Sequence, residues 1–328
     1  MPRKLLGLVM VCLIVASIPA LVVSVLESEP LSPPVQIKTS DLMVRVLNVK
    51  SGKVETLPLD DYLVGVVAAE MPAVFEPSAL AAQAIAARTY TLKRIRQGKS
   101  SHPGADLCSD PAHCQAWKGN DELWREWGVL HYAGYHRKIA EAVESTRGLV
   151  VTYQGELIDP VYHSTCGGAT ENSEDVWVYK VPYLRGVACG YCGGAPHYQD
   201  EVTVSWDDLY KKLGLSPAVP VASGAGKSKN SGPATIQAFA HSPTGRIKTL
   251  VVGQKRFAGT EIRSRLGLAS TRFRWQLNSD GVTFYTQGYG HGVGMCQYGA
   301  QGLARAGKTP AEILQYYYQG VEIQRMGS

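Results

Sequence analysis

The sequence predicts an α+β fold behind a single-pass N-terminal membrane helix. Strand-like stretches such as LMVRVLNV, from Leu42, are mixed with separated helical stretches, and a long apolar run lies within the first thirty residues. A doubly wound sheet would show a regular alternation of strands and helices, and we find neither that alternation nor an internal repeat. The 328 residues, of which 45% are hydrophobic, suffice for one large domain or two small ones.

The membrane helix is expected over residues 5–26. Arg3 and Lys4 precede this mostly apolar run, which can span a bilayer because about 20 residues suffice. We recognise no small-x-small cleavage site, so we favour an uncleaved anchor over a cleaved signal peptide and over a buried helix. Since basic flanks stay in the cytoplasm, residues 1–4 should be a cytoplasmic tail and the rest of the chain should lie outside.

Residues 27–36 have the composition of a Pro-rich stalk, and residues 37–328 are expected to form the folded domain. A low-complexity loop is expected near 216–235. The net charge of +5 is modest and spread along the chain. We therefore expect no nucleic-acid partner, while a weak preference for anionic surfaces or substrates stays open.

Several helices have recognisable start or stop signals. The stretch LDDYLVGVVAAE has two acids near its start and is stopped by Pro72. A second, Ala-rich helix begins at Pro77, a residue suited to the first helical position. Another helix is expected near Arg137–Ser145, before the strand-like GLVVTYQGELI. The segment GYGHGVG should be a turn between a strand and a helix that ends at Gly307, and a capping box beginning at Thr309 starts the final helix.

Glu70 is the one acid on the apolar face of the first helix. Leu63, Val66, Val67 and Glu70 fall at i, i+3, i+4 and i+7. The ordinary explanation is a last-turn residue, partly exposed and balanced by a Lys or Arg. The functional alternative is that burial raises its pKa, so that a protonated carboxyl can deliver a proton to a leaving oxygen. Arg88, on the next helix, could bind an anionic substrate group or hold Glu70 ionised.

A histidine and two cysteines form a candidate metal site. His102, Cys108 and Cys114 are spaced as H-x5-C-x5-C, and thiolate with imidazole suits zinc. The spacing is not a common zinc-finger pattern, and a Cys108–Cys114 disulfide fits it equally well. His113 is a poor fourth ligand because neighbouring side chains diverge, so water or substrate could fill that position.

The other cysteines beyond the anchor lie in or near Gly-rich motifs. Cys166 in YHSTCGGAT and Cys296 in GHGVGMCQYG each have a histidine nearby, so a Cys–His nucleophile is conceivable. We favour the simpler interpretation that these turns shape a cleft and that their cysteines are structural. Cys189 and Cys192, in CGYC, can pair with each other or with other cysteines.

Three blocks in a fixed order are together specific: AAEMPAVFEPSALAAQAIAARTYTL, YHSTCGGATENSEDVW with PYLRGV, and GYGHGVGMCQYGAQGLARAG. In these blocks the chain resembles the stage II sporulation protein D family over nearly all of its extracytoplasmic part. Its short anchor is similar to that of the sporulation members rather than of the larger amidase-enhancer relatives. The resemblance implies a two-lobed, mixed α+β catalytic domain with a central cleft.

The activity implied by the resemblance is that of a lytic transglycosylase, which cuts peptidoglycan glycan strands between MurNAc and GlcNAc and leaves a 1,6-anhydro end. Strands stripped of stem peptides are the preferred substrate. The family acts in forespore engulfment at the mother-cell membrane, beside a membrane-anchored amidase/endopeptidase and a multi-spanning membrane scaffold protein. The alternatives are a zinc-dependent wall hydrolase and a non-catalytic wall-binding or amidase-enhancer module.

The resemblance also assigns residues around the cleft. Glu70 matches the family's catalytic acid. Arg88, and Tyr183 with Arg185 in PYLRG, match positions that the family uses around its cleft, the last commonly being Lys. We therefore expect these three residues to bind substrate.

The metal assignment is strengthened in the same way. His102, Cys108 and Cys114 match a zinc site of some members, which we expect to be structural, with water or an unknown group as fourth ligand. The chain departs from the family at Cys166 and Cys296, where Ser is usual. Two such replacements in two Gly-rich motifs suggest that these cysteines lie close together and form a disulfide.

Overall fold

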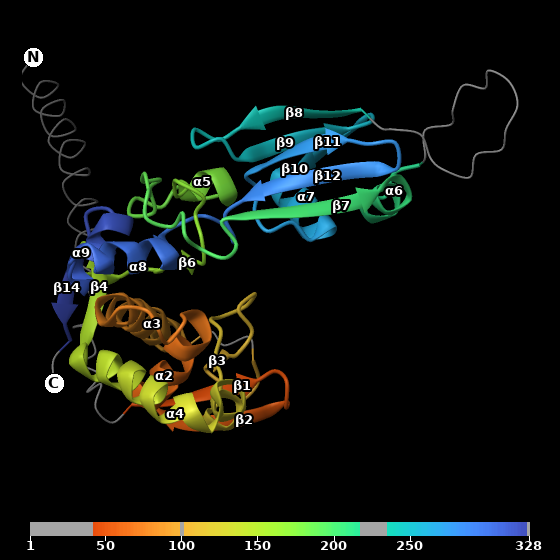
Figure 1. Cartoon of the computed structure of the whole chain (residues 1–328). Helices are drawn as coiled ribbons and strands as arrows, with labels where there is room; N and C mark the ends of the chain where they lie inside the picture. Colours follow the sequence, from red (N-terminus) through yellow and green to blue (C-terminus); the bar gives the residue numbers. More distant parts are fainter. Residues whose placement is uncertain (1–41, 99–101, 217–234, 327–328) are drawn as a thin grey trace, which may run out of the picture. The chain divides into compact units, whose positions relative to one another are not determined.

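The computed structural model describes residues 42–98, 102–216 and 235–326 (Figure 1). The expected cytoplasmic tail, membrane helix and Pro-rich stalk lie outside these residues, as does nearly all of the expected loop near 216–235. Within the described ranges, no helix is both long enough and apolar enough to cross a membrane. The prediction of a mixed α+β architecture is confirmed by the order of helices and strands.

The helices of the described residues are α2 (Leu59–Glu70), α3 (Pro77–Gln97), α4 (Asn120–Ser145), α5 (Ser173–Val176), α6 (Trp206–Leu213), α7 (Gly259–Leu266), α8 (Gln297–Arg305) and α9 (Pro310–Tyr317). The strands form small separate sheets. Their members, in spatial order, are β2 (Lys53–Pro58), β1 (Met43–Asn48) and β3 (Leu107–Cys108); β14 (Glu322–Arg325), β4 (Leu149–Tyr153) and β5 (Glu156–Leu157); β13 (Met295–Cys296) and β6 (Tyr162–His163); β10 (Lys255–Ala258), β9 (Ile247–Val252) and β8 (Ile236–His241); β11 (Phe273–Leu277), β12 (Gly281–Gln287) and β7 (Gln199–Ser205).

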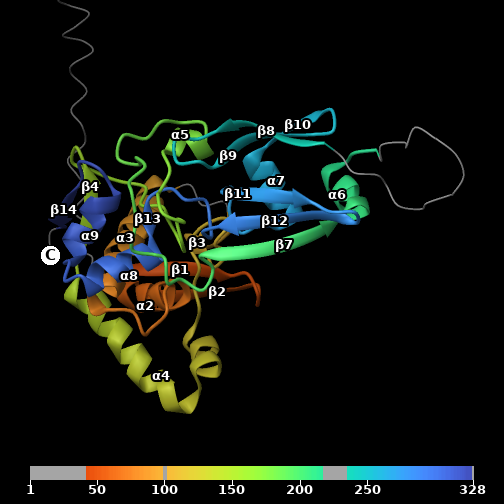
Figure 2. The ribbon, with the colours of Figure 1, turned by 45° about the horizontal axis from the view of Figure 1, so that its top comes forward.

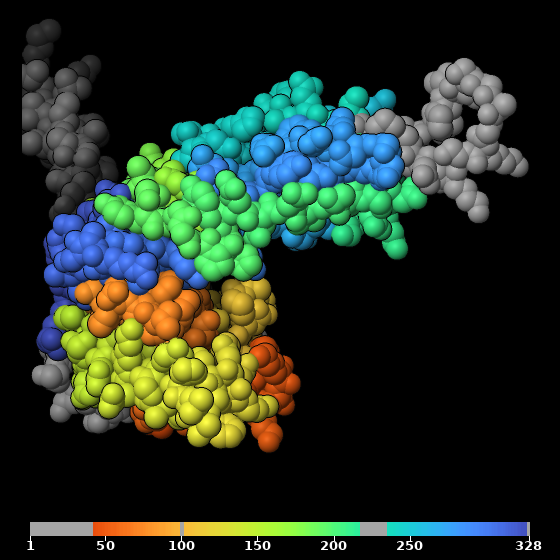
Figure 3. All heavy atoms as spheres, in the orientation of Figure 1, coloured from red at the N-terminus to blue at the C-terminus, as the bar shows by residue number. Residues whose placement is uncertain are grey.

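The first hydrophobic core is built around α3. Pro77 starts this helix at its first position, and Gly98 ends it in the left-handed conformation, with φ of 60°. The Ala-rich sequence between them is almost entirely buried, because small side chains let α2, α4, α8 and α9 approach closely. Figure 3 shows α8 and α9, in blue, directly against α3, in orange.

A second hydrophobic core lies between the sheets of β7–β12 and helices α6 and α7. Ser205 caps α6 by accepting a hydrogen bond from the Asp208 backbone N–H. Leu209 and Leu213 of that helix are fully buried, as are Phe257 and Phe284 of the strands. The two cores have no buried residue in common, so the second is a distinct packing region of the same compact unit.

A Gly-rich connection ties the two cores together. The Arg246 guanidinium, on the second-core side, donates to the Cys166 carbonyl at 2.7 Å and lies 3.5 Å from the Glu171 carboxylate. Gly292 packs against it with φ of 87°, and a Cβ there would lie 2.6 Å from the guanidinium. No larger residue fits this position without displacing the buried cation.

Most of the expected elements are present, and α4 is the main correction. The sequence predicts a helix near Arg137–Ser145, whereas α4 already begins at Asn120. Gly128, with φ of 66° and ψ of 171°, breaks the helix sharply into two pieces, as Figure 2 shows. This bend hides the helical periodicity of the first half. The capping box that begins at Thr309 is confirmed at α9.

Candidate functional site

Glu70 lies at the end of the apolar face of α2, where the helix reaches a cavity. Leu63, Val66 and Val67 are completely buried, whereas Glu70 is partly exposed, as the last position of that face. The cavity has a volume of about 320 Å³ and is lined by residues from both core regions. Its lining residues include Tyr162, His163, Ser164, Arg263, Tyr289, His291, Gln297 and Tyr298.

Both oxygens of the Glu70 carboxyl group accept a hydrogen bond. The Ala116 backbone N–H donates to Oε1 at 2.8 Å, and the Gln297 side-chain amide donates to Oε2 at 3.1 Å. Burial raises the pKa of Glu70, and these two donors offset only part of that effect because they favour the charged form. Among the described residues, no Lys or Arg forms an ion pair with Glu70, so the ordinary explanation of a balanced surface acid is wrong.

The histidines in the cavity wall are neutral and serve to hold the loops. His291 accepts from the Val293 N–H through Nδ1, at 3.1 Å, and donates through Nε2 to the Tyr162 carbonyl, at 2.9 Å. Burial lowers the pKa of His291 to about 4 and that of His163 well below its usual range. Neither ring carries a charge near neutral pH, which leaves Glu70 as the acid of this cavity.

Arg263 of α7 supplies the positive charge. It is the only Lys or Arg among the lining residues that the structure describes, and no acidic partner for its guanidinium is seen in those same ranges. The neighbouring Arg265, in contrast, forms an ion pair with Glu261 at 2.7 Å. Sequence reasoning missed Arg263 because it lies outside the three motif blocks. The one available signal in the sequence was that Arg263 has no acidic residue three or four positions before or after it to form an ion pair on the helix.

Arg88 is inside the protein and does not reach the cavity. Its side chain is fully buried and donates to the backbone carbonyls of Thr146, at 2.7 Å, and Val143, at 3.0 Å. It also lies 3.4 Å from the Asp60 carboxylate. The guanidinium thus joins α2 and α3 to the C-terminal carbonyls of α4, where a positive charge is favourable. Substrate cannot reach it, so this geometry gives Arg88 a structural role instead of the expected binding role.

Tyr183 and Arg185 are likewise not brought to Glu70. The Tyr183 hydroxyl accepts from the Asp159 N–H at 2.9 Å, and its ring lies against Tyr153. Arg185 forms a two-pronged ion pair with Glu174, which holds the short helix α5. Neither residue lines the cavity, and the expectation that they bind substrate has no support in this geometry.

The first candidate metal cluster consists of His102, Cys108 and Cys114. Its ligand atoms lie within 4.8 Å of one another, because β3 places Cys108 beside β1 and the loop after it folds back. His113 is exposed and outside the group, its ring centroid 5.6 Å from that of His102. Two sulfurs and one imidazole nitrogen fit zinc with one further position to fill, as the resemblance implies.

This cluster is directly connected to Glu70. Cys114 is followed by Gln115, whose side-chain amide donates to the Tyr62 hydroxyl at 3.1 Å and accepts from the Tyr162 hydroxyl at 2.9 Å. The next residue, Ala116, supplies the N–H that binds Glu70 Oε1. The cluster therefore lies two residues from one of the two donors to the carboxyl group.

A second cluster gathers Cys166, Cys189, Cys192 and Cys296. All four are buried, their sulfurs lie within 4.8 Å of one another, and none is in a disulfide. The expected proximity of Cys166 and Cys296 is confirmed, but the expected disulfide between them is not formed. This cluster could bind a metal such as zinc. Sequence reasoning missed it, although the CGYC spacing was a signal, because the other two cysteines are distant in the chain.

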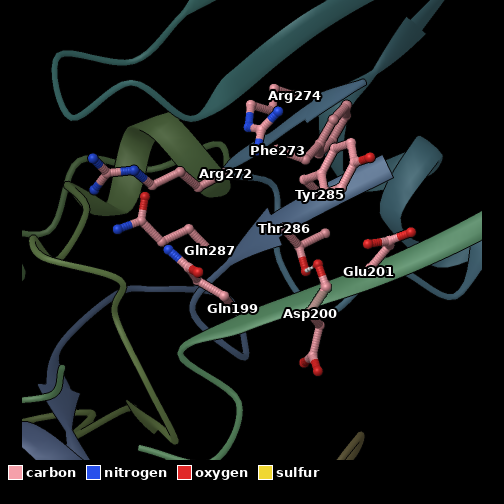
Figure 4. A pocket seen from close by; sticks show the side chains of 9 residues that line it. All are labelled: Gln199, Asp200, Glu201, Arg272, Phe273, Arg274, Tyr285, Thr286 and Gln287. Atoms are coloured by element: carbon pink, nitrogen blue, oxygen red, sulfur yellow. Dashed lines mark hydrogen bonds between the residues drawn. The ribbon is translucent and has the colours of Figure 1, made fainter. Parts of the chain in front are cut away.

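A larger hollow of about 430 Å³ lies between β7, β11 and β12, and Figure 4 shows its lining side chains. Arg274 stacks over the Tyr285 ring there, with its guanidinium carbon 4.2 Å from the ring centroid. None of the residues predicted for the functional site lines this hollow. The chain continues from Gln287, at its edge, to Tyr289 in the Glu70 cavity.

Comparison with known proteins agrees with the sequence blocks. Residues 48–153 match the model of the SpoIID family, described as stage II sporulation protein. The chain is 37% identical over 288 residues to stage II sporulation protein D of Bacillus subtilis (strain 168), covering 88% of this chain and 80% of that protein. It is 27% identical to the amidase enhancer of the same organism, over 80% of this chain and 40% of the longer protein. An uncharacterized protein of Brachyspira hyodysenteriae is 30% identical, over 82% of this chain and 67% of that protein.

Proposed function

Because this chain belongs to the stage II sporulation protein D family, we propose that it is a lytic transglycosylase that cuts peptidoglycan glycan strands between MurNAc and GlcNAc. The observation that carries the proposal is the Glu70 cavity. Glu70 is the only carboxyl group among its described lining residues, and burial raises the pKa of that group. Hydrolysing glycosidases use two carboxyl groups, about 5–9.5 Å apart. A lytic transglycosylase needs one, because the nucleophile belongs to the substrate.

In the proposed reaction, protonated Glu70 donates its proton to the glycosidic oxygen as an oxocarbenium-like centre develops at C1 of MurNAc. The bond from C1 to that oxygen breaks, and the GlcNAc hydroxyl leaves. The Glu70 carboxylate is then stabilised by the Ala116 N–H and the Gln297 amide. It takes the proton of the MurNAc C6 hydroxyl, whose oxygen bonds to C1. The product is a 1,6-anhydro end, and Glu70 is protonated again.

The substrate contact that fits best is with Arg263. A strand without stem peptides carries free lactyl carboxylates, and a guanidinium binds a carboxylate through two parallel hydrogen bonds. Arg263 lines the cavity and has no acidic partner among the described residues, so it replaces Arg88 in this role. Tyr289, which is 46% exposed, offers an aromatic face to a sugar ring.

The cluster of His102, Cys108 and Cys114 would hold zinc in a structural role. When bound, the metal would fix the loop that carries Gln115 and Ala116. No step of the proposed reaction requires it, because proton transfer is assigned to Glu70. A zinc-dependent hydrolase remains the rival proposal, and a non-catalytic wall-binding or amidase-enhancer module is the second.

The cellular setting is proposed by analogy with the family. We place the chain in forespore engulfment, anchored once in the mother-cell membrane with its catalytic domain outside the cytoplasm. Its partners would be a membrane-anchored amidase/endopeptidase and a multi-spanning scaffold protein. In this proposal, the two core regions are the two lobes of the enzyme, and the Glu70 cavity is its cleft.

The decisive experiment digests glycan strands without stem peptides in isotopically labelled water and analyses the products by mass spectrometry. The wild-type chain should release anhydro ends without label, and Glu70→Gln should be slower by roughly a hundredfold or more. Asp61→Asn is the matched control, because Asp61 is an exposed acid on the same helix. It should cut as the wild type does.

Three outcomes would contradict the proposal. Anhydro ends that persist at full rate in Glu70→Gln would remove the acid from its role. Labelled reducing ends would favour the zinc-dependent hydrolase. Intact strands with the wild-type chain, under conditions in which the chain still binds them, would favour the non-catalytic module.

A further inference from the structure

We propose that Cys166, Cys189, Cys192 and Cys296 hold one zinc ion in a closed site of four thiolates. The four sulfurs are buried and lie within 4.8 Å of one another. Tetrahedral zinc with bonds of about 2.3 Å to sulfur would keep its sulfurs about 3.8 Å apart, which is compatible with this arrangement. A cluster of several iron ions would require sulfurs further apart. The proposal stands independently of the enzymatic activity.

The ligands come from three segments that only the fold brings together. Cys166 follows β6, and Cys296 is the residue immediately before α8. Cys189 and Cys192 lie in a loop between α5 and β7, with the C-x2-C spacing by which two thiolates bind the same zinc ion. Such a site would join distant parts of the chain beside the cavity.

Hydrogen-bond donors surround the sulfurs. Cys296 Sγ accepts from the backbone N–H groups of Cys166 and Gly299, both at 3.3 Å. The Tyr317 hydroxyl lies 3.2 Å from Cys189 Sγ. Donors in this position stabilise the negative charge of metal-bound thiolates, and the positive end of α8 adds to the effect at Cys296. The bond from Gly299 also caps α8, whose first residue follows Cys296.

Gly299 shows how closely the cluster is enclosed. A Cβ at this position would lie 2.1 Å from the Tyr317 hydroxyl and 2.6 Å from Cys189 Sγ. Only glycine therefore lets α8 approach the cysteines and donate its backbone N–H to Cys296. The enclosure leaves no room for an additional ligand from this side, as a closed structural site requires.

Two disulfides are the main alternative, and the geometry favours one ion instead. A disulfide joins each sulfur to a single partner at about 2.05 Å. Here the sulfurs of Cys166 and Cys192 are 3.3 Å apart, and every sulfur has the other three within 4.8 Å. One ion at the centre satisfies all four sulfurs together.

The test is zinc analysis of the full-length chain, purified in detergent with its metal. Elemental analysis by mass spectrometry should find about two zinc ions per chain in the wild type. The variant Cys108→Ser/Cys114→Ser, which removes the first cluster, should keep one ion. X-ray absorption at the zinc edge should then show a first shell of sulfur alone. The matched variant Cys166→Ser/Cys296→Ser should lose this ion and keep the other.

Thiol labelling separates the alternatives. After denaturation with a chelator and without reductant, peptide mass spectrometry should find all four cysteines alkylated. Disulfides among them would overturn the proposal, as would iron in place of zinc or oxygen and nitrogen in the first shell. If Cys166→Ser/Cys296→Ser does not fold, the wild type and the first-cluster variant still decide, because both retain the four cysteines.

Discussion

The two sides of the Glu70 carboxyl group are built differently. On the Oε1 side, the donor is a backbone N–H, at Ala116, two residues after Cys114 of the first cluster. On the Oε2 side, the donor is a side-chain amide, at Gln297, directly after Cys296 of the second cluster. One cluster is local in sequence and partly exposed, and the other is assembled from distant segments and buried.

The difference teaches what each cluster can contribute. Ligands close in the chain restrict only a short loop, so their metal adds little to the stability of the whole fold. Ligands from three distant segments hold together parts of the first core that lie far apart in the chain, so their metal adds more to the stability of the whole fold. The first cluster should therefore exchange its metal easily. The second, buried cluster should behave as part of the hydrophobic core.

The largest expected effect is on stability. The variant Cys189→Ser/Cys192→Ser should lower the free energy of unfolding by about 5 kcal/mol, because the binding free energy of a structural zinc is folding free energy. The variant Cys108→Ser/Cys114→Ser should lower the free energy of unfolding by clearly less. Denaturant unfolding of the two variants, purified in the same way, makes the comparison. Equal losses of unfolding free energy in the two variants would show that the two clusters contribute equally to stability, which would contradict this expectation.

The next effect is on the rate. Gln297→Leu removes one donor to the Glu70 carboxylate, which should slow the reaction by roughly ten- to a hundredfold, since a hydrogen bond to a charged group contributes about 1.5–3 kcal/mol. This donor lowers the pKa of Glu70, so its loss should raise that pKa. The alkaline limb of the pH–rate profile should then move to higher pH, because Glu70 stays protonated longer. A slower variant with an unmoved limb would assign Gln297 a purely structural role.

Metal release should be biphasic. With a chelator at neutral pH, zinc from the first, partly exposed cluster should appear within minutes, and zinc from the second, buried cluster should appear only when the chain unfolds. A colorimetric zinc indicator follows both phases. In Cys108→Ser/Cys114→Ser the fast phase should be missing. A single fast phase for both ions would contradict the difference in enclosure.

The smallest effect concerns Glu70 itself. Because its pKa is raised in the folded state, the native chain binds a proton more tightly than the unfolded one, and stability falls as pH rises through the folded pKa. Glu70→Gln removes this loss, so the variant should be more stable than the wild type at pH 8. The gain should vanish below the unfolded pKa of Glu, near pH 4. Thermal unfolding of the wild type and Glu70→Gln at both pH values measures this difference in stability. An equal gain at both pH values would show that the titration of Glu70 is not its cause.

The sequence was a good guide wherever the deciding interactions are local. Helical periodicity identified Glu70 as the acid on an apolar face, and the capping signals located α3 and α9. The spacing of His102, Cys108 and Cys114 predicted a cluster because all three lie on one short segment.

The other features of the site depend on packing between segments that are distant in the chain, and the sequence could not predict this packing. Arg88 lies only eighteen positions after Glu70, yet its direction on α3 points it to the end of α4 instead of the cavity. Gln297, which binds Glu70, and Arg263, which lines the same cavity, come from segments about two hundred residues further along the chain. Gly-rich motifs indicated a turn, but only the folded chain shows that Cys189 and Cys192 join Cys166.

Each donor to Glu70 lies within two residues of a cluster cysteine, and this proximity has a consequence for control. If both clusters bind a metal as we propose, loss of either ion would loosen one of the two segments that supply a donor to the Glu70 carboxyl group. The first cluster is local in the chain and partly exposed, so its metal is the one that we expect to be lost first. The proposed lytic activity would then depend on the occupancy of the site that binds its metal more weakly.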